Sequence, residues 1–131
     1  MKFRESDIKD TERLQKMIKK EAESIFSSEK ARRGRDLETI EFTVRQGKIA
    51  ELYLIENYGY QESDKKWHDL FDANGDYTEV KAYRNVWSKE APFVEKDLRR
   101  IRSEKWNFSK WYMLFSVSEG EYELLEKIQI R

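Results

Sequence analysis

The apolar positions of the first sixty residues repeat every three to four residues, which predicts two helices. Ser6 and Asp7 form the expected N-cap of the first helix. The stripe of that helix consists of Leu14, Met17, Ile18, Ala22, Ile25 and Phe26. The second helix spans residues 37–58 and ends at Gly59, because glycine tolerates the left-handed conformation of a helix end. Its inward positions are Leu37, Ile40, Val44, Ala50, Leu54 and Ile55.

The pattern changes to alternation after residue 66, which predicts a β-hairpin. The first strand covers residues 67–72, with Trp67, Asp69 and Phe71 on one side. Asn74-Gly75 favours a tight type I′ turn, and residues 77–83 form the return strand. Pro92 opens a helix over residues 93–105. Residues 111–117 are apolar throughout and predict a strand buried on both faces, before a turn and a final strand over residues 122–130.

This order of elements predicts one α/β domain, and the composition agrees. The 131 residues include 40% charged and 14% aromatic side chains, enough aromatic material for a core. No apolar run approaches the length of a membrane span, so we expect no membrane partner. Cysteine is absent and the first residues lack an apolar leader, which indicates a reducing, cytoplasmic setting. With a single histidine, His68, histidine-based metal clusters and triads are excluded, and we expect a structural or exposed role for it.

The formal net charge is zero, which removes the simplest argument for nucleic-acid binding. Basic residues nevertheless gather in two places that could contact phosphates: Arg32, Arg33 and Arg35, and Arg99, Arg100 and Arg102. Both clusters are equally well explained as solvated surfaces. Three tryptophans are candidates for base stacking, but packing in a core or interface is the more frequent role: Trp87, Trp106 and Trp111.

The hairpin carries the candidate chemistry. Glu79 and Lys81 are two residues apart on one strand, so they share a face, and a hairpin folded about Asn74 brings Asp69 opposite Glu79. Two carboxylates can hold Mg²⁺, and an ammonium group can orient water or stabilise phosphate charge. These are the requirements for metal-assisted phosphodiester hydrolysis. A one-residue change of register would place Asp72 there instead of Asp69.

These residues resemble the PD-(D/E)XK, or restriction-endonuclease-like, nuclease superfamily: Asp69, a turn, then Glu79-Val80-Lys81, after a helix that carries Glu51. The resemblance implies a core of a helix, three strands, a helix and a fourth strand over residues 36–131, a mixed sheet flanked by helices. Residues 1–35 would be an added helical arm with a basic linker. Two departures stand out, since His68 replaces the proline of the motif, and no Gln-x-x-x-Tyr follows the lysine.

The resemblance also implies the site. Asp69 and Glu79 would bind Mg²⁺, or Mn²⁺ in its place, with the Val80 carbonyl as a further ligand. Glu51 would assist through the metal or a water, and Lys81 would align the attacking water. Glu38 and Glu41 compete with Glu51 for its role.

We therefore expect a metal-dependent endonuclease that hydrolyses DNA. A homodimer would suit the cutting of two strands, and the apolar stripe of the first helix could cover either a second subunit or the domain's own sheet. The alternatives are a non-catalytic nucleic-acid-binding or assembly module of the same fold, and an unrelated α/β interaction domain.

Overall fold

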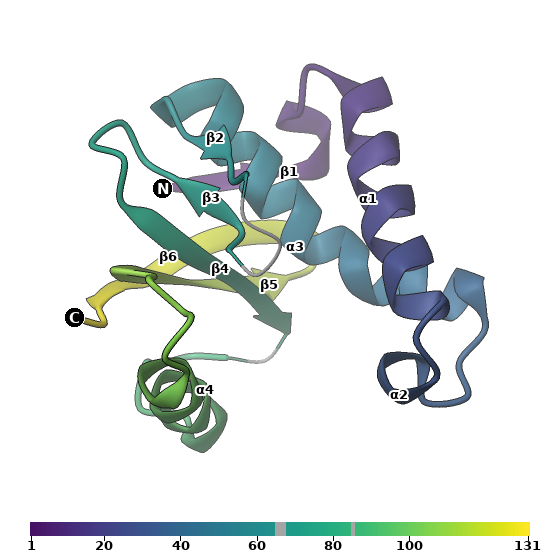
Figure 1. Cartoon of the computed structure of the whole chain (residues 1–131). Coiled ribbons are helices and arrows are strands. Elements are labelled where there is room, and N and C mark those ends of the chain that lie inside the picture. Colours follow the sequence, from purple (N-terminus) through teal and green to yellow (C-terminus); the bar gives the residue numbers. More distant parts are fainter. Residues whose placement is uncertain (65–67, 85) are drawn as a thin grey trace.

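A six-stranded mixed sheet forms the centre of the protein, with helices on both of its faces (Figure 1). The computed structural model describes residues 1–64, 68–84 and 86–131. The helices are α1 (Thr11–Phe26), α2 (Glu29–Arg32), α3 (Leu37–Tyr58) and α4 (Pro92–Ser103), and a 3₁₀ turn spans Glu5–Asp7. The strands are β1 (Lys2–Arg4), β2 (Gln61–Glu62), β3 (Leu70–Phe71), β4 (Tyr77–Arg84), β5 (Trp111–Ser118) and β6 (Glu121–Gln129). The α/β class is thereby confirmed.

The helices begin and end at capping residues. Asp10 accepts a hydrogen bond from the Arg13 amide at 3.0 Å, so α1 begins at Thr11, and the expected cap at Ser6 and Asp7 is wrong. Those two residues belong to the 3₁₀ turn, in which the Asp7 carboxylate accepts the Arg4 amide. Helix α3 ends as expected at Gly59, whose φ of 73° is left-handed.

The sheet has the strand order β1-β6-β5-β4-β3-β2. Strands β4 and β5 are parallel and joined through α4, while the other neighbouring pairs are antiparallel. The predicted hairpin, the strand over residues 111–117 and the last strand are all present. The two edge strands were not predicted, since strands of two and three residues leave no periodic signal. Trp67, assigned to the first hairpin strand, lies outside the described residues.

Apolar side chains fill two layers on opposite faces of the sheet. One layer joins α1 and α3 to the sheet and includes Leu14, Leu52 and Val80. The other joins α4 to the sheet and includes Leu98 and Leu114. The stripe of α1 therefore packs within its own chain, although Phe26, expected in that stripe, is 37% exposed. Strand β5 contributes to both layers, as its uniformly apolar sequence predicts.

Two tryptophans do not enter the core, which is one of the two packing roles that the sequence favours; packing in an interface stays a prediction. Trp87 is 76% exposed and Trp106 is 44% exposed. Trp111 is half-buried, with the Lys127 ammonium 4.5 Å from its ring centre. No helix in the described part of the chain is long and apolar enough to cross a membrane.

Candidate active site

The hairpin register brings Asp69 to Glu79. Leu70 pairs with Thr78 and Phe71 with Tyr77, so one further step places Asp69 directly opposite Glu79. Asp69 immediately precedes β3, which begins at Leu70, and it bonds to the neighbouring strand through its side chain. Its Oδ2 accepts the Val80 amide proton at an N···O distance of 2.9 Å. This bond fixes one carboxylate oxygen on the backbone of the strand that carries Glu79 and Lys81.

Asp72, the competitor for this role, serves the turn. One of its carboxylate oxygens accepts the amides of Asn74 and Asp76, at 2.9 and 3.0 Å. These bonds close the loop around Gly75, whose φ is 82°. The expected type I′ turn is wrong, because it needs a positive φ at both Asn74 and Gly75 and only Gly75 has one; the Gly75 amide instead donates to the Asp72 carbonyl at 2.9 Å. The register thus assigns Asp69 to the candidate site and Asp72 to the hairpin turn.

Glu79 is a buried carboxyl group that is 7% exposed. Its pKa is raised to about 8, mainly by burial and then by the charge of Asp69 and a hydrogen bond with Asp69, while Lys81 opposes the shift. Burial alone would lower the pKa of Lys81, but the negative charges of Asp69 and Glu79 outweigh this, and the net shift is upward. The two carboxyl groups and the ammonium group therefore form one electrostatic unit.

Glu51 lies on α3 and is 5% exposed. Its pKa is raised to about 8, first by burial and then by repulsion from Asp69, with Lys48 opposing the shift. The Lys48 Nζ atom lies 3.1 Å from Glu51 and 2.5 Å from Glu21 of α1. Lys48 and Glu21 were not predicted as part of the site. The three-residue spacing of Lys48 and Glu51 on a helix was the available signal for the first of them.

The sheet separates Glu51 from Glu79. Val80 belongs to the layer under α1 and α3, so its neighbours Glu79 and Lys81 face the α4 side. On that side the hydroxyl groups of Tyr83 and Tyr112 both donate to Asp97, at 3.0 Å each. Asp69 lies between the two faces of the sheet, and its charge therefore raises the pKa of both Glu51 and Glu79.

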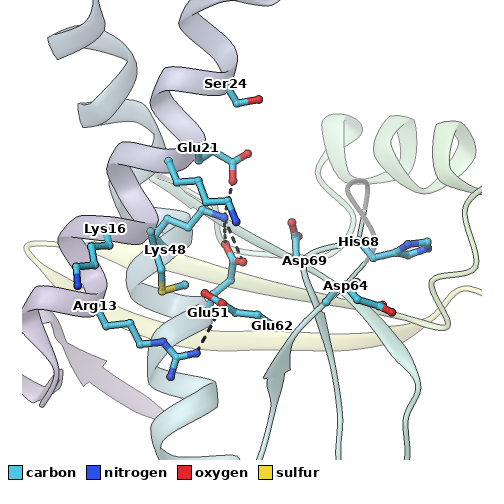
Figure 2. Close-up of a pocket in the computed structure, with 13 residues that line it drawn as sticks. Arg13, Lys16, Glu21, Ser24, Lys48, Glu51, Glu62, Asp64, His68 and Asp69 are labelled. Atoms are coloured by element: carbon cyan, nitrogen blue, oxygen red, sulfur yellow. Dashed lines mark hydrogen bonds and ion pairs between the residues drawn. The ribbon is translucent and has the colours of Figure 1, made fainter.

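A cleft of about 640 Å³ opens between α1, α3 and the start of β3. Figure 2 shows Glu51, Lys48 and Glu21 pointing toward one another, with Asp69 across from them and His68 turned away. Glu79 and Lys81 do not line this cleft, and neither do Glu38 and Glu41. Asp69 is thus reached from the cleft, with Glu79 behind it.

His68 has the structural role that its position predicts. It is 4% exposed, and its Nε2 accepts the Phe108 amide proton at 2.8 Å. Its ring stacks on Tyr77 with centres 4.3 Å apart. His68 therefore fixes the segment before β3 to the segment before β5.

The two basic clusters make mostly local contacts. The Arg35 guanidinium donates to the carbonyls of Ala31 and Arg32, and the Arg32 guanidinium lies over the Phe26 ring. Arg33 ends α2 with a left-handed φ of 53°. These contacts place the first cluster at the end of α2.

In the second cluster, Arg99 pairs with Glu95 and Arg100 with Glu104 along α4. Arg102 donates to the Ile130 carbonyl. Arg100 also has an electrostatic effect on Glu79, which it stabilises in the charged form. Arg100 is therefore the cluster member whose charge acts on the candidate site.

The acidic side chains of the candidate site are potential ligands of a metal ion. Among residues 1–64, 68–84 and 86–131, no three acidic or histidine side chains are grouped closely enough to hold one. Asp69 and Glu79 do form a carboxylate pair, and Mg²⁺ commonly takes one or two carboxylates and keeps several waters. The pair therefore fits Mg²⁺, with Asp69 as the more accessible ligand and Glu51 on the other side of it.

Comparisons of this chain with protein-family models, with curated proteins and with solved structures find no match.

Proposed function

We propose that the protein is a metal-dependent endonuclease of the PD-(D/E)XK type, acting on DNA. The observation that carries the proposal is the contact of Asp69 with Glu79 beside Lys81, on a hairpin whose register places the two carboxyl groups opposite each other. The order α3, β2, β3, β4, α4, β5 supports it, because it is the order of elements that the resemblance implies.

The roles follow from the surroundings of each group. Asp69 and Glu79 would hold Mg²⁺, which when bound would supply charge stabilisation for a phosphodiester and lower the pKa of a water. Lys81 stays protonated beside them and orients the attacking water. Glu51 acts from the cleft side of Asp69, and the Lys48 ammonium balances part of the Glu51 charge. The Val80 carbonyl is the further ligand that the resemblance implies.

The test is cleavage of plasmid and branched DNA with Mg²⁺ or Mn²⁺, by the wild type and by Glu79→Gln and Lys81→Met. We expect loss of activity by at least 100-fold in both variants, since each removes a group acting on the reacting phosphate (about 10²–10³ for one stabilising donor). Glu90→Gln, an exposed carboxylate on the loop before α4, is the matched control and should retain full activity. Equal activity in Glu79→Gln and the control would refute the site.

The second candidate is a nucleic-acid-binding module of the same fold that does not cut. One observation favours it: Glu79 lies behind Asp69 and does not line the cleft. Wild-type protein that binds DNA and Mg²⁺ but leaves every substrate intact would establish this alternative.

A further inference from the structure

The side of the cleft that α1 forms carries positive charge that no described residue pairs with. Lys16 and Lys20 of α1 both line the cleft and are exposed. Neither forms an ion pair with any residue that the structure describes. The two are four residues apart, so they are neighbours on one helix face, and like charges at this spacing destabilise a helix by about 0.2–0.5 kcal/mol. The chain thus keeps a small unfavourable interaction on this side of the cleft.

The acidic groups of the same cleft are already engaged. Lys48 forms ion pairs with both Glu21 and Glu51, and Arg13 pairs with Glu62 at 3.8 Å. Asp64 accepts the Tyr77 hydroxyl, and Asp69 accepts the Val80 amide. Those partners hold the acidic side chains in place. The available charge on the α1 side of the cleft is consequently the two ammonium groups, although the cleft as a whole contains both signs.

We propose that Lys16 and Lys20 bind the phosphates of a single nucleic-acid strand that enters the cleft and reaches Asp69. This inference rests on the proposed nuclease function, because a phosphodiester is the substrate of the Asp69 and Glu79 pair. A cleft of about 640 Å³ has the size of a small-molecule site, which suits the sugar-phosphate backbone of one strand better than the two strands of a duplex. The substrate class is then an unpaired strand, such as an overhang, a flap or a displaced strand.

The α1 side of the cleft differs from the two arginine clusters in what its side chains do. Arg35 and Arg102 bind backbone carbonyls of the protein, and Arg99 and Arg100 pair with glutamates. These arginines would share their donors between the protein and a phosphate. Lys16 and Lys20 have no such bonds to any described residue, so an incoming phosphate would relieve their mutual repulsion without that competition.

The experiment measures binding of a fluorescent oligothymidine in EDTA, where no cleavage occurs, as a function of salt. Lys16→Gln/Lys20→Gln should weaken binding by about 25-fold at 0.1 M salt and reduce the slope of log K against log[salt] by about 1.4, since each single-strand phosphate contact contributes about 0.7. The matched control is Lys9→Gln/Lys19→Gln, which removes two exposed lysines of the same region that do not line the cleft. It should bind like the wild type.

The outcomes separate this inference from the nuclease proposal. The inference is overturned if the two double variants weaken binding equally, or if neither weakens it. It is also overturned if the protein binds a duplex more tightly than a single strand, or if polyglutamate competes as well as an unlabelled single strand. Strand binding that depends on Lys16 and Lys20 without any cleavage in Mg²⁺ would support it while refuting the nuclease. Full cleavage activity in both double variants would support the nuclease proposal and overturn this inference.

Discussion

Glu79→Gln should make the protein more stable at neutral pH, while it removes the proposed activity. In the folded chain burial and the charge of Asp69 together raise the pKa of Glu79 from its ordinary value of 4.5 to about 8, with burial as the larger cause. A carboxyl group with a raised folded-state pKa contributes stability that is complete below pH 4.5 and is lost as the pH rises toward 8. Glutamine keeps the shape of the side chain and does not titrate.

The magnitude follows from this pKa. Each pH unit between the unfolded and folded pKa values changes the free energy of unfolding by about 1.4 kcal/mol. From pH 5 to pH 7 the wild type should therefore lose up to about 3 kcal/mol relative to Glu79→Gln. Glu79 is only 7% exposed, so solvent screening reduces this value little.

The assay is urea unfolding in EDTA at pH 5 and pH 7, with Glu90→Gln as the control for loss of one exposed carboxylate. The control should follow the wild type at both pH values. Parallel pH dependence in the wild type and Glu79→Gln would refute the assignment of Glu79 as a buried, repelled carboxyl group. Saturating Mg²⁺ should then stabilise the wild type and not Glu79→Gln, because a ligand stabilises the state that binds it.

Four further substitutions test the fold and the register. Leu114→Ala, at a side chain with 0% exposure on β5, should cost about 2–5 kcal/mol of unfolding free energy in urea titrations. Gly59→Ala, at a left-handed φ of 73°, should cost about 1–2 kcal/mol in the same titrations. Asp69→Asn should abolish metal-dependent cleavage, whereas Asp72→Asn, which keeps an acceptor oxygen for the turn amides, should retain it in an assay with branched DNA; the reverse result would mean that the register is wrong.

The sequence predicts most elements because their signals are local. The Asn74-Gly75 turn fixes the hairpin, Pro92 begins α4 and Gly59 ends α3. The start of α1 was wrong because several acidic and hydroxyl residues precede the stripe, and only the fold selects Asp10 as the cap. The exposure of Trp87 and Trp106 was not predicted because a large aromatic side chain carries no local signal of which face it occupies.

For the site, the alternation of the hairpin predicts the pairing of Asp69 with Glu79, and the register agrees. The sequence could not show that Val80 anchors the strand in the layer under α3, which turns Glu79 and Lys81 toward α4. The sequence also could not show the cleft. Lys16 and Lys20 have the pattern of the solvated face of an amphipathic helix, and only the positions of α3 and β3 beside α1 make them line a cleft.

Asp69 links the two halves of this arrangement. Its charge raises the pKa of Glu51 on the cleft side and of Glu79 on the α4 side, so the folded chain carries repulsion on both sides of one carboxylate. The bond from the Val80 amide holds Asp69 there in spite of that repulsion. A cation bound at Asp69 would relieve both interactions at once. Under the proposed function, the same residues that lower stability in the absence of metal would therefore favour metal binding.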